Sequence, residues 1–68
     1  MKVQVLQASK ADPLTFIVMS EGVAFEYAFM EDTALDVLKR LRAAARRQET
    51  ITVDVVDVKS TRRLGSGL

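Results

Sequence analysis

The sequence of 68 residues contains no cysteine, no histidine and no tryptophan. Without cysteine, the chain has neither the disulfide bonds nor the thiolate-bound zinc that stabilise many small domains. Without histidine as well, it lacks the commonest thiol nucleophile, the commonest general base near neutral pH and the main ligands of transition metals. We therefore expect a protein that is not an enzyme and has no catalytic residue, cofactor or metal ion.

Long apolar runs are also lacking. The N-terminal segment MKVQVLQASK is interrupted by Gln4 and Gln7, so it does not have the continuous apolar core of a secretory signal. No run approaches the ~20 apolar residues that are needed to cross a bilayer. These features predict a soluble, cytoplasmic protein with no membrane partner.

Hydrophobic residues nevertheless make up 49% of the chain. A chain of this length forms one domain and buries only about 60% of the surface that it would expose when unfolded. Apolar surface that the small core leaves uncovered is expected to pack against a second copy or another partner. We therefore expect a homo-oligomer, in the simplest case a dimer.

Three segments in the first half of the chain have the composition of β-strands. Residues 1–8 alternate loosely between apolar and polar side chains, and residues 14–19 are rich in β-branched and aromatic side chains. Residues 23–30 alternate with a period of two. Three consecutive strands of this kind predict an antiparallel meander.

The second and third strands are close enough to form a hairpin. A two-residue loop that ends at Gly22 suits the turn, because such turns need the positive φ that glycine readily adopts. This loop places Val18 opposite Phe25 and Phe16 opposite Tyr27. A slip of one residue would move the aromatic side chains to the other face, so the register is well defined.

An amphipathic helix is predicted over residues 33–48. Asp32 or Thr33 is the expected N-cap, and Asp36 stands where the acid of a capping box follows Thr33. The apolar residues of one helical face are Ala34, Leu35, Leu38, Leu41 and Ala45.

The segment ITVDVVDV, residues 51–58, predicts a fourth strand, parallel to the first or the third. The fold is therefore an α+β domain over residues 1–59 in the order β-β-β-α-β, a three-stranded meander with one helix on one face. Residues 60–68 lose periodicity and gain serine and glycine, which predicts a flexible basic tail. The predicted core of the sheet consists of Val3, Val5, Leu14, Phe16, Val18, Val23, Phe25, Tyr27, Phe29, Ile51, Val53 and Val55.

The pair Val55 and Val56 breaks the alternation of the last strand. Either a bulge re-aims Asp57 and Val58, or both faces of the strand are apolar there. Without a bulge, Asp57 lies near the start of the helix, where its charge is favourable. We expect a structural role for Asp57.

The face of the sheet away from the helix has no element to cover it. Scattered apolar residues on a surface are normal and need no partner. Five larger apolar side chains on one uncovered face nevertheless favour a sheet-to-sheet dimer or a partner site. The predicted protein interface consists of Leu6, Ile17, Met19, Val56 and Val58.

Charge is unevenly distributed although the formal net charge is only +1. Residues 1–38 hold two basic residues against six acidic ones, whereas residues 39–68 hold eight against three. On the helix, Arg40 follows Asp36 by four residues and is expected to pair with it. No acid on the helix neutralises Lys39, Arg42 and Arg46, and the tail is expected to add a flexible basic arm. The residues predicted to bind an anionic partner are Lys39, Arg42, Arg46, Arg62 and Arg63.

Three interpretations of this basic surface are open, in order of preference: a solvated helix, a site for an acidic protein surface, and a site for nucleic acid. Cations near the end of a helix are favoured by its dipole and need no partner. The aromatic residues that would stack on bases are assigned to the core. The sequence therefore predicts a small accessory or regulatory protein-interaction module, with electrostatic nucleic-acid binding as the alternative.

Overall fold

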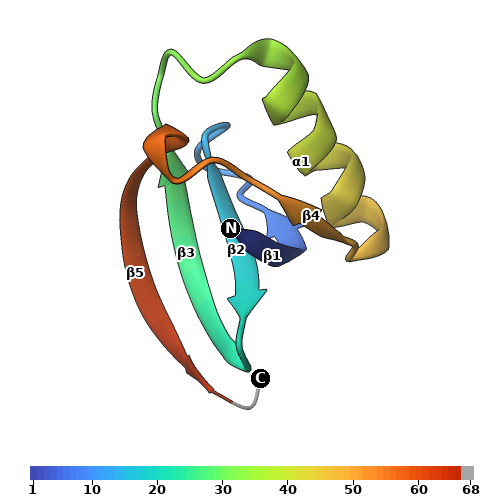
Figure 1. The fold of residues 1–68 in the computed structure, drawn as a ribbon, viewed down its shortest axis with the longest axis vertical. Coiled ribbons are helices and arrows are strands. Elements are labelled where there is room, and N and C mark those ends of the chain that lie inside the picture. The colour runs from blue at the N-terminus through green and yellow to red at the C-terminus, as the bar shows by residue number, and fades with distance from the viewer. Residues whose placement is uncertain (67–68) are drawn as a thin grey trace.

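The computed structural model describes residues 1–66, which fold into one helix packed on a five-stranded sheet (Figure 1). The elements in chain order are β1 (Lys2–Ala8), β2 (Thr15–Ser20), β3 (Val23–Phe29), α1 (Leu35–Arg47), β4 (Thr50–Thr52), the 3₁₀ turn η1 (Val55–Asp57) and β5 (Val58–Ser66). The strands are antiparallel and lie in the order β4-β1-β2-β3-β5. The α+β class is confirmed, but the sheet has five strands instead of four.

The β2–β3 hairpin has the predicted register. Val18 lies opposite Phe25, and Phe16 lies opposite Tyr27. The two loop residues both have positive φ, 51° at Glu21 and 77° at Gly22, as a type I′ turn requires. The turn therefore fixes which side chains of both strands face the core.

The helix begins later than predicted and without the predicted cap. Its N-cap is Ala34, which makes no side-chain hydrogen bond. The Thr33 N–H donates to the Met30 carbonyl at 3.1 Å, so the residues before Ala34 form a separate turn. Thr33 is buried, and its hydroxyl has no hydrogen-bond partner among the described residues. The Thr33 side chain is therefore packed in the interior and does not cap the helix.

The end of α1 is fastened to β1. Gln48 ends the helix in the left-handed conformation, with φ 54° and ψ 44°. Its carbonyl accepts a hydrogen bond from Gln4 Nε2 at 2.9 Å, and its own side-chain Nε2 donates to the Leu6 carbonyl at 3.4 Å. The Val5 N–H donates to the Glu49 carbonyl at 3.0 Å. These contacts hold the helix over β1, at one side of the sheet.

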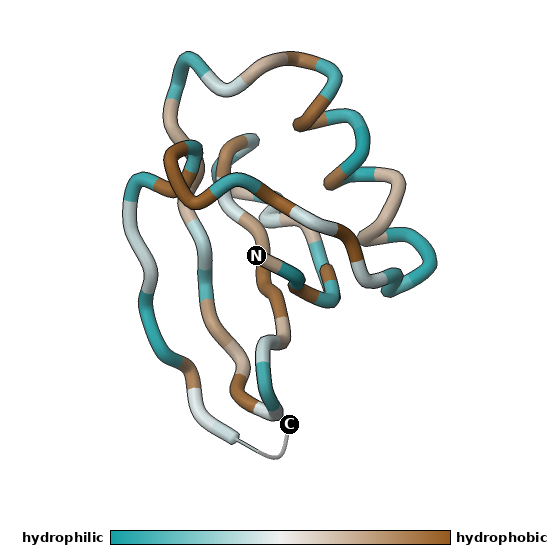
Figure 2. Tube along the Cα trace, viewed as in Figure 1, coloured by the Kyte–Doolittle hydropathy of each residue, from teal (hydrophilic) through white to brown (hydrophobic). Residues whose placement is uncertain are grey.

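The core lies between α1 and the adjacent sheet face. Phe16 and Phe29 are fully buried and pack edge to face, with ring centroids 5.8 Å apart and an angle of 81° between the rings. Leu41 is fully buried on the helix side. Hydrophobic residues run without interruption through most of β2, whereas they alternate with hydrophilic ones in the first half of β1 (Figure 2). The predicted core is confirmed for most of the sheet, with Leu14, Phe25 and Ile51 partly buried against it. Val23 is partly buried outside this cluster, and Val55 is 65% exposed.

The predicted fourth strand is wrong, because residues 51–58 do not form one element. The short β4 pairs antiparallel with β1, not parallel to it. The chain then crosses the core face of the sheet at Val53 (Figure 1). The Val53 N–H donates to the Met1 carbonyl at 2.8 Å, and the Met1 amino group donates to the Val53 carbonyl at 3.1 Å. Asp54 Oδ1 accepts a hydrogen bond from the Val56 N–H at 3.1 Å, and this contact caps η1. The expected strand thus ends in a turn.

The prediction of a flexible tail is wrong for residues 60–66, which belong to β5. This strand pairs with β3 from Phe29 to Val23. Most of its side chains are exposed, so its sequence shows no apolar period. Residues 67 and 68, the rest of the predicted tail, lie outside the described residues.

Within residues 1–66, no helix has the length and the apolar character required to cross a membrane.

Replacement of Leu41 tests the position of the core. We expect Leu41→Ala to lower the free energy of unfolding by about 2–5 kcal/mol, because it leaves a cavity under the helix. Leu35→Ala is the matched control, since Leu35 is 62% exposed, and its effect should stay within about 0.5 kcal/mol. Urea denaturation followed by circular dichroism measures both. Equal losses in the two variants would contradict this packing.

Candidate interaction surfaces

One face of β2, β3 and β5 is not covered by α1. The side chains of this open face, defined by the strand register, are Thr15, Ile17, Met19, Ala24, Glu26, Ala28, Ser60 and Arg62. Gln4 and Gln7 of β1, the partners of Met19 and Ile17, border it. Ile17 and Met19 are its large apolar members, and both are partly exposed. Ala28 beside them is small and partly exposed, whereas Ala24 is already fully buried within the chain.

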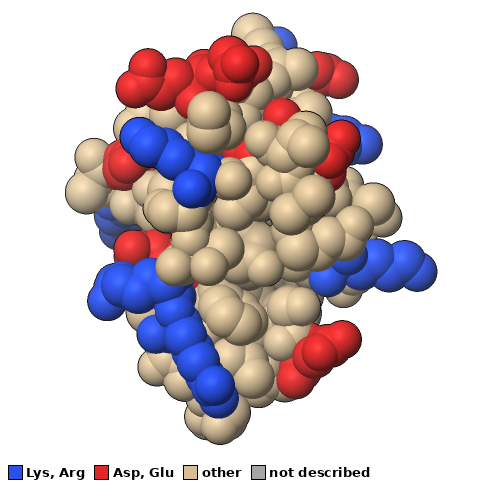
Figure 3. Space-filling view, turned by 60° about the vertical axis from the view of Figure 1, so that its left-hand side comes forward, with Lys and Arg blue, Asp and Glu red and all other residues tan. Residues whose placement is uncertain are grey.

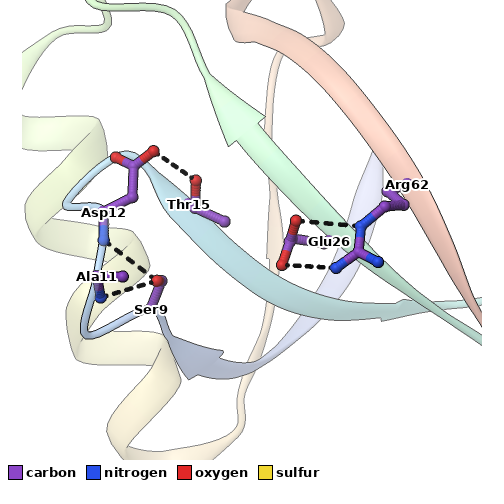
Figure 4. Close-up of polar contacts among 6 residues, drawn as sticks. All are labelled: Ser9, Ala11, Asp12, Thr15, Glu26 and Arg62. Carbon is purple, nitrogen blue, oxygen red and sulfur yellow. Dashed lines mark hydrogen bonds and ion pairs between the residues drawn. The ribbon is translucent and has the colours of Figure 1, made fainter.

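Glu26 and Arg62 form an ion pair across the open face (Figure 4). Arg62 Nη2 lies 3.2 Å from Glu26 Oε2, and Arg62 Nε lies 3.4 Å from Oε1. The two residues are direct cross-strand partners on β3 and β5. The pair contributes at most about 1 kcal/mol, because 68% of the Arg62 side chain and 37% of the Glu26 side chain are exposed. Its larger effect is that the face carries no net charge.

The loop before β2 closes one end of the open face (Figure 4). Ser9 Oγ accepts hydrogen bonds from the N–H groups of Ala11 and Asp12 at 3.1 and 3.2 Å. The Asp12 carboxylate accepts from the Leu14 N–H at 2.9 Å and from the Thr15 hydroxyl at 3.0 Å. The side chains of Ser9, Asp12 and Thr15 are thus tied together at the start of β2.

The structure separates the five residues of the predicted protein interface. Only Ile17 and Met19 lie on the open face. Leu6 occupies the irregular position between Val5 and Gln7 in the β1–β2 register. Val56 is 73% exposed but belongs to η1, and Val58 lies opposite Phe29 and packs against the core.

The predicted anion-binding residues also fall into two groups. Lys39, Arg42 and Arg46 lie on α1, which packs on β1, whereas Arg62 and Arg63 lie on β5 at the far edge of the sheet (Figure 1). They do not form one basic surface.

Few contacts within the described residues involve the cations of α1. Arg42 is partly buried, and its Nη2 lies 3.5 Å from the Pro13 carbonyl. The expected pair of Asp36 with Arg40 does not form. The sole ion pair within residues 1–66 is that of Glu26 with Arg62. Lys39 and Arg46 are exposed on the helix.

The outer edge of β5 is a further surface, which sequence reasoning missed because the segment was expected to be a tail. β5 is the last strand of the sheet. The Phe29 N–H points to β2 and the Met30 N–H points to β5, so alternation directs the backbone of Glu26 and Ala28 toward β5. Their partners Arg62 and Ser60 therefore bond to β3, and the N–H and carbonyl groups of Thr61 and Arg63 point outward.

Basic side chains gather along β5. Figure 3 shows lysine and arginine side chains on the side where β5 comes forward, beside a broad uncharged surface. Lys59, Arg62 and Arg63 belong to this strand, which contains no acidic residue. Glu26 on β3 neutralises only one of the three.

Two open hollows lie at the surface. One is lined by the start of β1, the β2–β3 turn and Thr50, and the other by Arg40, Met1 and the segment from Thr52 to Val55. In the part of the chain that the structure describes, no three acidic side chains are grouped as metal ligands.

Comparison with protein-family models, with curated proteins and with solved structures finds no match. Function is therefore inferred from the surfaces of the molecule.

Amide hydrogen exchange tests the pairing of β5. We expect the amide hydrogens of Ser60 and Arg62 to exchange roughly ten times more slowly than those of Thr61 and Arg63, because only the first two bond to β3. NMR measurement of exchange resolves the single residues. Uniformly fast exchange from residue 60 onward would contradict the strand.

Proposed function

We propose that this chain is a non-enzymatic protein-interaction module that forms a homodimer by stacking two open faces. The observation that carries the proposal is the partial exposure of Ile17 and Met19 on a sheet face that the single helix does not cover. In the dimer, the face of the partner takes the place that a second layer has in larger domains.

The size of the chain supports a second copy as the occupant of this face. One helix and one sheet give a single thin core, and 68 residues bury a smaller fraction of their surface than a larger domain does. Stacking of two sheets removes the same apolar side chains from water in both copies. The dimer thus adds a second apolar layer without any further sequence.

The charges of the open face also suit a second copy. In a two-fold contact, every pairing occurs twice. If residue i of one copy touches residue j of the other, residue j of the first copy also touches residue i of the second. In the middle of the face, the acid Glu26 and the base Arg62 already lie side by side, and the Asp12 carboxylate lies at its end on the Thr15 hydroxyl. A two-fold axis between the copies can place each Glu26 near the Arg62 of its partner, so stacking does not bring like charges together.

Electrostatic binding of nucleic acid has less support. Such binding is strongest where many cations lie along one surface. Here α1 and the edge strand β5 carry separate basic groups, which do not form one surface.

A charge placed on the open face tests the dimer. We expect wild-type protein to elute with the mass of two chains in size-exclusion chromatography with light scattering. Ile17→Glu and Met19→Glu should each raise the dissociation constant by roughly a hundredfold, because an unpaired buried carboxylate costs several kcal/mol. The spectrum by circular dichroism should stay unchanged.

Leu35→Glu is the matched control, because Leu35 is an exposed apolar residue at the start of α1, away from the open face. Its mass should remain that of the dimer. A wild-type monomer at every concentration would overturn the dimer, and a dimer that resists both substitutions would assign it to another surface. A monomer that gains mass only with nucleic-acid fragments at low salt would favour the alternative function.

A further inference from the structure

The two edges of the sheet differ in how far they are protected from other strands. Natural proteins protect sheet edges with short strands, prolines, irregularities and charges. At one edge, β4 has only three residues. At the other, β5 has nine residues and no proline. β5 carries cations and two register shifts, but the residues between the shifts are regular, and no strand pairs with their outer side within the described residues. This part of the edge is therefore able to accept a further strand whose charge suits the cations.

The accessible part of this edge is well defined. The β3–β5 register is regular from Ser60 to Arg63 and shifts on either side, between Ala28 and Phe29 and between Ala24 and Phe25. Within this window, the outward backbone groups are those of Thr61 and Arg63. An incoming strand would bond to these groups, and its side chains would lie beside those of β5.

The charges of β5 select the chemistry of that strand. Arg62 shares the open face with Glu26, whereas Arg63 lies opposite Phe25 on the core side and makes no ion pair within the described residues. Consecutive residues of a strand point to opposite faces, so cations flank the edge on both sides. Lys59 adds a third positive charge at the start of the strand.

A second copy of β5 does not fit this edge. Two such strands side by side would bring their lysine and arginine residues together, and like charges across a strand pair are destabilising. An acidic strand has the opposite effect, because its carboxylates pair with Arg62 and Arg63. Charge complementarity therefore points to a segment of another protein.

We infer that the outer edge of β5 binds an extended acidic segment of a partner protein, which is added to the sheet as a further strand. The inference rests on the proposed interaction role of the chain. It does not require the open-face dimer, because the backbone groups of Thr61 and Arg63 point away from β3 at the edge, although Arg62 borders both surfaces. Main-chain hydrogen bonds to Thr61 and Arg63 hold the segment, and the cations set its preference for acidic residues.

The probe for the test is a synthetic peptide as long as β5, in which pairs of glutamates alternate with pairs of threonines, so that carboxylates lie on both faces of the added strand. The matched peptide has lysine in place of glutamate. Binding to the full chain is measured by isothermal titration calorimetry at low and moderate salt, and amide exchange by NMR. We expect the acidic peptide alone to bind, and the amides of Thr61 and Arg63 to become protected.

Two variants separate the backbone from the charges. Thr61→Pro removes an outward N–H but leaves the bonds to β3 and every cation in place, and edge strands tolerate proline at such positions. Arg63→Glu reverses a charge at the edge. Each should weaken binding roughly tenfold or more. Arg46→Glu on α1 makes the same charge reversal on an exposed helical residue and should leave binding unchanged.

Binding that survives Thr61→Pro, or that falls equally with Arg46→Glu, would overturn strand addition in favour of general attraction between charges. Failure of the acidic peptide to bind would also overturn it. If an oligonucleotide binds through Arg63 while the peptide does not, the edge recognises nucleic acid instead. If Arg63→Glu makes the chain associate through β5, the cations only protect the edge. Ile17→Glu should leave peptide binding intact, so failure of the dimer and failure of this inference remain distinguishable.

Discussion

A single helix of thirteen residues has to cover a sheet of five strands, and this constraint determines what the rest of the molecule leaves exposed. The contacts of Gln48 and Glu49 with β1 fix α1 over one side of one face. The chain then crosses the same face at Val53 before it reaches the opposite edge. The helix α1 and the segment at Val53 thus both lie on one face. The other face and the outer edge of β5 have no covering element within the described residues.

The charges follow the same division of the molecule. Glu31 follows Met30, whose N–H donates to the Asp57 carbonyl at 2.8 Å, so acids lie near the start of β5, whereas Arg62 and Arg63 lie further along that strand. On the open face the two signs meet in the pair of Glu26 with Arg62 and cancel. A neutral face and a positive edge suit different partners. The small formal net charge of the chain therefore conceals two surfaces with different preferences.

The sequence predicted those parts of the fold in which buried side chains set the pattern. The β2–β3 register followed from the alternation of apolar residues around Gly22, and the helical face followed from Leu38 and Leu41. β5 was missed because its position depends on backbone pairing with β3, while its side chains stay in water and leave no period. The cap at Thr33 was wrong because the side chain is buried, a tertiary effect that local sequence does not encode.

The candidate surfaces were predictable to a similar extent. Ile17 and Met19 were placed correctly because they belong to the regular hairpin. Leu6 and Val58 were not, since single-residue irregularities in β1 and β5 move side chains relative to the pleat. Val56 was lost from the predicted face when Asp54 capped η1 and ended the strand. The β5 edge had a visible signal, the cluster of Lys59, Arg62 and Arg63, but no indication that it lay on a strand.

The most direct test of the central claim, that a second copy covers the open face, is an isotope-filtered NMR experiment on a mixture of labelled and unlabelled chains. Only contacts between two copies give signals in this experiment. The account predicts intermolecular contacts from the methyl groups of Ile17 and Met19 and none from Val55 or Val56. Intermolecular contacts from η1 alone, or none from any methyl group, would contradict it.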